Sequence, residues 1–316
     1  MQVHIGGFDF RDFSLGFELI KGMLEKYPRL KEVRMDIHER LRDEDADSFG
    51  KCPNLEKIKI RGVSVSFVKR LLERLPNLRE LTVIATGRFA AGDAGSFGQC
   101  PELKKVWIGR WQDISFIDKL LGSLPKLKEL TIVATGKFAE GNADSFGQCP
   151  GLEKVWIDGE RQNISFVKEL LKMLPKLKEL KINVGEQFTE DDAGSFGQCP
   201  GLERVRIDGP PAQRISFVKE LLRQLPEIKD LRIRVDEELD ESVGEVFRES
   251  SKLQHLVVTG CLMPGFLKSV LRPQAPPQVS PLKQLTVNET NDSQPPSAED
   301  EEAVEAAKAR GVMVRF

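Results

Sequence analysis

A leucine pattern that returns about every 25 residues constrains this chain more than any other feature. Most successive copies of the pattern L-x-x-L-x-L begin 23 to 26 residues apart. A fixed period in the twenties predicts a solenoid, which grows by adding units and needs no single central core. The first positions of the copies are Leu30, Leu55, Leu78, Leu103, Leu127, Leu152, Leu177, Leu202, Ile228, Leu253 and Leu282.

Each unit begins with a short stretch in which side chains alternate. In LEKVWI, Val155 and Ile157 point one way, whereas Lys154 and Trp156 point the other way. This alternation predicts a short strand with one buried face.

A helical segment follows the strand in every second unit. In ISFVKELLKMLP we expect Ser165 to cap the first turn and Pro175 to end the helix. The other units carry a loop rich in Gly and Asp with a short helical turn. One face of the long helix is apolar: Phe166, Val167, Leu170, Leu171 and Leu174.

Phenylalanines repeat as regularly as the leucines, and we interpret them as stacked core residues. They form two series, one in each type of unit: Phe49, Phe97, Phe146 and Phe196, and Phe67, Phe116, Phe166 and Phe217.

These patterns predict a curved α/β solenoid with a parallel inner sheet and helices on the convex side. No unit can bury its apolar face alone, so only stacking stabilises it. We expect a single domain over residues 1–316, with a partial repeat at 1–29, repeats at 30–281, and a last repeat and cap at 282–316. A Pro-rich loop at 272–281 lengthens the last step of the pattern.

The two ends of the chain differ. At the start, QVHI resembles the tail of a strand with no polar cap before it, so we expect an upstream domain or a partner to cover this end. Near the other end, Ser297 is expected to cap a helix that Gly311 ends, with VMVRF as a final edge strand.

Charge and hydropathy exclude several partners. The chain has 47 basic and 49 acidic residues, which argues against a nucleic-acid binder. No apolar run reaches the length of a membrane span, and the first residues lack the profile of a signal peptide. We therefore expect a cytoplasmic protein with no membrane contact.

Four of the five cysteines occupy one equivalent place, just before a proline: Cys52, Cys100, Cys149 and Cys199. The sister units have leucine at that place. We interpret these cysteines as small buried hydrophobes rather than as disulfide partners or metal ligands. The odd number points to a reducing, intracellular setting.

The segments CPGLEKVWI and LPKLKELKI resemble the leucine-rich repeats of the ribonuclease-inhibitor-like class. The resemblance covers nearly the whole chain. Such repeats form the C-terminal sensor regions of NACHT-containing innate immune receptors and the substrate-reading halves of F-box proteins. The resemblance thus implies a protein-binding role in one of these two settings.

We find no residues arranged for catalysis. The three histidines, His4, His38 and His255, lie in unrelated repeats without a nearby metal-ligand companion, and no phosphate-binding loop occurs. We therefore expect no enzyme activity, no cofactor and no metal.

The outward positions of the strands form rows along the concave face. The first row alternates in charge over nine strands, from Glu32 and Lys57 to Arg204 and Asp230. We interpret this row as a self-complementary ladder of ion pairs rather than as a ligand site.

The second row places Trp107 and Trp156 on the solvent-facing side, alternating with Thr. Exposed Trp beside Arg is typical of interface hot spots. Trp111 is expected past the end of its strand, in a structural role. The residues that we expect to bind a protein or peptide ligand are Trp107, Trp156, Ile84, Val133, Lys181, Arg206, Arg232 and Arg234.

The sequence therefore predicts a non-enzymatic recognition module. We expect the sensor region of an intracellular immune receptor, and the alternative is a substrate adaptor of a ubiquitin ligase.

Overall fold

The computed structural model describes residues 2–5, 14–36, 41–272, 282–290 and 293–316. Contacts divide the chain into two compact units, Met1–Glu160 and Arg161–Phe316. The prediction of a single domain stays a prediction. Most of the Pro-rich loop, residues 273–281, lies outside the described residues.

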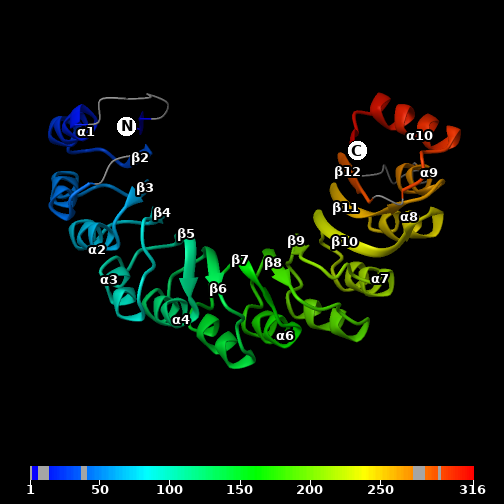
Figure 1. Ribbon diagram of the computed structural model, residues 1–316, viewed down its shortest axis with the longest axis horizontal. Coiled ribbons are helices and arrows are strands. Elements are labelled where there is room, and N and C mark those ends of the chain that lie inside the picture. The colour runs from blue at the N-terminus through cyan, green and yellow to red at the C-terminus, as the bar shows by residue number, and fades with distance from the viewer. Residues whose placement is uncertain (1, 6–13, 37–40, 273–281, 291–292) are drawn as a thin grey trace. The chain divides into compact units, whose positions relative to one another are not determined.

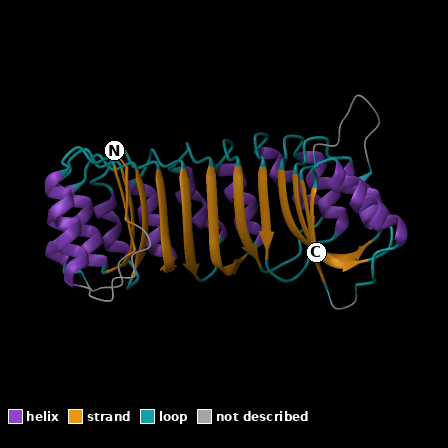
Figure 2. Ribbon diagram, turned by 90° about the horizontal axis from the view of Figure 1, so that it is seen from above, coloured by secondary structure: helices purple, strands orange, loops and turns teal. Residues whose placement is uncertain are grey.

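The first unit is a parallel sheet whose strand order follows the chain. Helices lie on one side of this sheet (Figures 1 and 2). Its strands are β1 Gln2–Ile5, β2 Glu32–Asp36, β3 Lys57–Val63, β4 Glu80–Ala85, β5 Lys105–Asp113, β6 Glu129–Thr135 and β7 Lys154–Gln162, which ends just past the unit. Its helices are α1 Ser14–Lys26, α2 Val65–Arg74, α3 Ala94–Phe97, α4 Ile114–Ser123 and α5 Ala143–Gly147, with 3₁₀ turns η1 Asp43–Lys51, η2 Ala91–Asp93 and η3 Glu140–Asn142.

The second unit repeats this plan. Its parallel strands are again neighbours in chain order, with helices on one side of the sheet (Figure 2). Its strands are β8 Glu179–Val184, β9 Arg204–Asp208, β10 Asp230–Leu239, β11 His255–Leu262, β12 Gln284–Glu289 and β13 Met313–Arg315. Its helices are α6 Ile164–Met173, α7 Ile215–Gln224, α8 Glu241–Arg248, α9 Phe266–Leu271 and α10 Ala298–Ala309, with the 3₁₀ turn η4 Asp191–Gln198.

The alternation of strand and helix is confirmed, together with both expected end strands, β1 and β13. The C-terminal helix is also confirmed, because Ser297 caps α10 and Gly311 follows it with a φ of +85°. The expected cap of α6 is wrong. The N-cap residue is Asn163, and Ser165 lies inside the helix.

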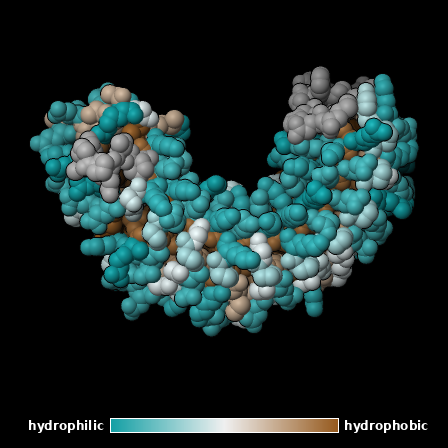
Figure 3. Space-filling view, turned by 180° about the vertical axis from the view of Figure 1, so that it is seen from behind, coloured by the Kyte–Doolittle hydropathy of each residue, from teal (hydrophilic) through white to brown (hydrophobic). Residues whose placement is uncertain are grey.

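Rings and leucines fill the space between sheet and helices, as the repeats predict. Both phenylalanine series are fully buried. A third phenylalanine packs against the two series in some repeats. Phe89 stacks on Phe116 with ring centroids 5.1 Å apart, and Phe188 stacks on Phe217 with centroids 4.8 Å apart. On the face seen in Figure 3, hydrophilic side chains cover most of the surface and apolar ones show only between them.

The four repeated cysteines are buried free thiols, as expected, and the structure adds a reason for cysteine at this place. The Cys100 thiol donates to the carbonyl oxygens of Leu72 and Leu75, at 3.5 and 3.2 Å. These carbonyl groups lie at the C-terminal end of α2, where the helix offers no further amide donors for them. A thiol supplies a donor there, which a leucine cannot.

Burial raises the pKa of the repeated thiols, to about 12 for Cys100, Cys149 and Cys199. They therefore stay protonated at pH 8, and the thiolate is the reactive form. We expect a thiol reagent such as DTNB to label only the half-buried Cys261 in the native protein, and all five cysteines after unfolding. Fast reaction of more than one thiol in the native state would contradict this assignment.

The row of alternating charge is confirmed as ion pairs within each unit. In the first unit Lys57 pairs with Glu80 at 2.5 Å, and Lys105 pairs with Glu129 at 2.8 Å. In the second unit Arg204 pairs with Glu179 at 3.2 Å. Such partly exposed pairs stabilise the protein by only ~0.2–1 kcal/mol each.

Candidate functional site

Trp107 and Trp156 lie on the solvent-facing side of the first unit's sheet, where the alternation places them. Both are half-buried. Trp107 pairs with Thr131 of β6, and Thr131 pairs with Trp156 of β7. The two tryptophans are thus two strand spacings apart, about 9–10 Å. Thr131 lies between them and is only 9% exposed, so the indole rings shield its small side chain.

Trp111 belongs to the same surface, and its expected position is wrong. Strand β5 extends to Asp113 and contains a bulge, because Ile108 pairs with Ile132 and Trp111 with Val133, the next residue of β6. Gly109 and Arg110 are the extra residues, and Arg110 has a φ of +69°. Two extra residues leave Trp111 on the same solvent-facing side as Trp107, where it is 47% exposed, and the bulge places it beside Val133. The sequence signal that could have found it is the isolated glycine inside the strand pattern.

Two glycines make room for the large side chains. A Cβ atom on Gly109 would lie 2.7 Å from Cγ1 of Ile84. A Cβ atom on Gly159 would lie 2.8 Å from Cζ3 of Trp111 and 2.3 Å from the carbonyl oxygen of Ala134. The ring of Trp111 therefore extends from β5 across β6 to β7.

We call Ile84, Trp107, Trp111, Val133 and Trp156 the tryptophan patch. All three tryptophans of the protein belong to it. Ile84 and Val133 are half-buried on β4 and β6, on the same side of the sheet. The patch joins large, partly exposed aromatic surface to a rigid sheet.

Charged groups border the patch. The ammonium group of Lys154 lies 3.6 Å from the centroid of the Trp156 ring, a cation–π contact that holds the indole in place. Arg110 donates to the carbonyl oxygen of Thr86 at 2.9 Å. An apolar centre with a polar rim is the usual anatomy of a protein interface.

A buried glutamine, which the sequence interpretation missed, positions the bulge. Oε1 of Gln112 accepts from the Phe89 amide at 2.9 Å, and Nε2 donates to the carbonyl oxygens of Gly109 and Arg110 at 3.4 and 3.3 Å. Gln162 and Gln213 are buried at equivalent places of later repeats. Their recurrence in WQDISF, RQNISF and AQRISF was the available signal.

The other four predicted residues lie in the second unit. Lys181, Arg206 and Arg232 are register neighbours on β8, β9 and β10, and Arg234 is two residues further along β10. Arg206 Nε donates to Asp208 at 2.6 Å, and Arg232 Nε lies 3.7 Å from the same carboxylate. The eight predicted residues therefore form two groups, one in each unit.

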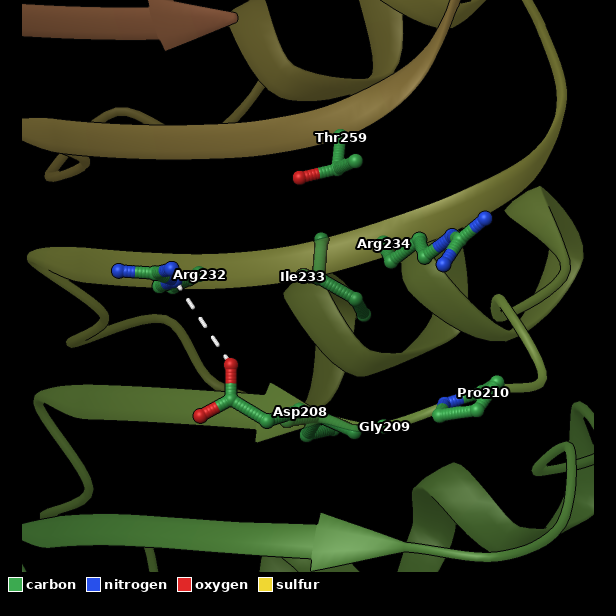
Figure 4. A pocket seen from close by; sticks show the side chains of 8 residues that line it. Asp208, Gly209, Pro210, Arg232, Ile233, Arg234 and Thr259 are labelled. Carbon is green, nitrogen blue, oxygen red and sulfur yellow. Dashed lines mark ion pairs between the residues drawn. The ribbon is translucent and has the colours of Figure 1, made fainter. Parts of the chain in front are cut away.

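A pocket of about 240 Å³ lies beside the second group. Figure 4 shows Arg232 and Arg234 on β10 at its two ends, with Asp208 and Pro210 opposite them and Thr259 on β11.

Within the described ranges, no three His, Cys, Asp or Glu side chains gather as a metal site requires. None of the helices in the described part of the chain is both long and apolar enough to cross a membrane.

Of the comparisons with known proteins, only the one with solved structures found matches. No protein-family model matches the chain, and no curated protein matches its sequence. Among solved structures, an internalin from Listeria monocytogenes matches with a TM-score of 0.53 and 13% identity, over 97% of this chain and 88% of that one. A chain of the Rad7 and Elc1 complex in yeast matches with a TM-score of 0.52 and 12% identity, over 96% and 89%.

The plant peptide hormone receptor RGFR1, in complex with RGF2, matches less well, with a TM-score of 0.48 and 14% identity. The match covers 85% of this chain and about half of the receptor chain, 49%. The two better matches show that this protein has the α/β leucine-rich-repeat fold. At 13% and 12% identity, these matches show a shared fold and nothing about function.

Proposed function

We propose that the protein is a non-enzymatic recognition module that binds a protein or peptide ligand on the tryptophan patch. The observation that carries this proposal is the placement of all three tryptophans on one side of one sheet, with Trp111 47% exposed. Core packing does not require an indole on the solvent-facing side. Burying such rings against a partner supplies most of the binding energy at typical interfaces.

The wider setting follows from the resemblance stated above. A cytoplasmic sensor region of an innate immune receptor is our first candidate, and a substrate adaptor of a ubiquitin ligase is the alternative. Both settings use a leucine-rich-repeat surface to capture a protein.

The test begins with peptides selected from a display library on the intact chain. We expect the double variant Trp107→Ala/Trp156→Ala to lose binding of the selected peptide by more than about 30-fold, because an interface hot spot contributes ~2 kcal/mol or more. Its melting temperature should stay close to that of the parent, because both rings are partly exposed. Binding is measured by isothermal calorimetry and folding by circular dichroism.

A matched control is Met313→Ala, because Met313 is 48% exposed on β13, outside the patch. We expect this variant to bind as the parent does. Since every tryptophan lies in the patch, bound peptide should also shift tryptophan emission to shorter wavelength. A large decrease in the melting temperature of the double variant would show that the two indole rings have a structural role. Unchanged peptide binding by a folded double variant would show that the ligand does not bind on the tryptophan patch.

A further inference from the structure

The pocket in the second unit exists because the ladder between β9 and β10 opens. Arg206 pairs with Arg232, and the next pairing joins Gln213 to Val235. Gln213 is seven residues beyond Arg206, but Val235 is only three beyond Arg232. The extra residues on the β9 side include Gly209, which has a φ of +103°, and two prolines, which lack an amide hydrogen for a ladder. The strands therefore separate between Arg232 and Arg234, and they pair again where the Gln213 amide donates to the carbonyl oxygen of Arg234 at 2.6 Å.

The charges around this opening are unbalanced. Asp208 is the only acidic residue in the pocket lining, and its short hydrogen bond is to Arg206, at 2.6 Å. Arg232 lies 3.7 Å from Asp208, which is an ion pair without hydrogen-bond geometry. Arg234 is exposed, and its guanidinium group has no ion pair or hydrogen bond within the described residues. Two guanidinium groups therefore remain available to an anion.

The rest of the lining suits a small oxyanion. The hydroxyl oxygen of Thr259 accepts from Asn288 at 3.2 Å, which leaves its own hydrogen free to donate. Ile207 and Ile233 are buried in the wall and exclude water from one side. A volume of about 240 Å³ is several times the roughly 30 Å³ that one water molecule occupies. A carboxylate with part of its side chain fits this space.

We propose that this pocket binds a carboxylate group of the ligand through the guanidinium group of Arg234, with Arg232 at the opposite end of the pocket adding positive charge. Charge-assisted hydrogen bonds from guanidinium to carboxylate are among the strongest in proteins, and the planar fork matches both oxygens. The inference rests on the proposed function for the ligand being a peptide or protein. Every peptide carries carboxylates, on acidic side chains or at its C-terminus.

The experiment follows the Nε–Hε resonances of the arginines by NMR in the whole chain while a probe is added. N-acetylglycine represents a terminal carboxylate, and N-acetylglutamate N-methylamide represents an acidic side chain. We expect at least one probe to shift the Arg232 and Arg234 resonances saturably. Arg234→Gln should weaken its binding by about tenfold, the effect of losing one charge-assisted hydrogen bond. The probe that binds more tightly identifies the source of the carboxylate.

Two further variants separate a built site from general surface charge. Arg315→Gln removes the same charge from the exposed side of β13 and should leave the affinity unchanged. Asp208→Asn removes the internal competitor for the arginines and should tighten binding, provided that its spectrum remains that of the folded protein. Equal effects of Arg234→Gln and Arg315→Gln, or no saturable shift with either probe, would overturn the proposal. Tighter binding of inorganic phosphate than of both carboxylate probes would overturn the choice of carboxylate.

These measurements are independent of the tryptophan patch. If binding of a selected peptide requires Trp107 and Trp156 but is unaffected by Arg234→Gln, only the proposed carboxylate site is refuted. Saturable binding of a probe, together with unchanged peptide binding by the Trp107→Ala/Trp156→Ala variant, would instead refute only the proposed binding on the tryptophan patch.

Discussion

Replacing Phe116 with alanine is expected to lower the free energy of unfolding by about 3–5 kcal/mol, the usual cost of deleting a buried ring. Phe116 is fully buried on α4. It stacks on Phe89 and meets Phe97 edge-on, with centroids 5.1 and 5.8 Å away. The cavity would lie between two neighbouring repeats. Because each repeat is stabilised by its neighbours, the loss should appear as earlier unfolding of this region.

Urea denaturation followed by circular dichroism measures this effect, and hydrogen exchange locates it. Trp111→Ala is the matched control, since it removes a larger ring that is 47% exposed and should cost much less. If the two variants were destabilised equally, the division into core phenylalanines and surface tryptophans would be wrong.

Replacing Asp300 with alanine should detach α10 from α9 and lower local stability by about 2–4 kcal/mol, because two amide donors lose their acceptor. The Asp300 side chain is 1% exposed and accepts from the amides of Gly265 and Lys268 at 2.7 and 2.8 Å. It also accepts from the Ser297 hydroxyl at 2.7 Å. Without the carboxylate, the amides at the start of α9 lose their partners, at a cost of ~1–3 kcal/mol each.

The pH dependence of this contact has a defined sign. Burial alone opposes ionisation of Asp300, but hydrogen bonds from Gly265, Lys268 and Ser297 outweigh it and lower the pKa. A lowered pKa in the folded state means that the stabilisation is fully present above the ordinary aspartate pKa of about 3.9, and is lost as the pH falls through the folded-state value.

Hydrogen exchange of α9 and α10 measures both effects of Asp300. Glu301→Gln is the control, because Glu301 is exposed in the same helical turn. Equal protection of α10 in the Asp300→Ala variant and the control would contradict the role of Asp300.

Most of the fold was predictable because its determinants are local. Leucine spacing, strand alternation and the helical face of ISFVKELLKMLP each concern a few consecutive residues. The outward row with Trp107 and Trp156 follows from the same alternation, and the strand register places it as expected. The repeated cysteines were also recognisable as buried, although their bonds to helix carbonyls were not.

The features of the structure that could not be predicted from the sequence depend on how neighbouring strands pair. Trp111 lies beside Val133 because two residues of β5 have no counterpart in β6, and a pattern within one strand cannot reveal this shift in register. Gln112 lies buried because the bulge leaves carbonyl groups that need a donor. The opening beside Arg232 exists because β9 and β10 pair again only after extra residues.

The sequence by itself determined a stacked α/β repeat and the side of the sheet on which Trp107, Trp156 and the arginines lie, since periodicity is a property of neighbouring residues. Only the tertiary structure decided that Trp111 joins the tryptophan patch and that Arg232 and Arg234 face an opening. Both depend on how many residues each strand inserts against its partner, and that number is set by hydrogen bonds between segments about 25 residues apart.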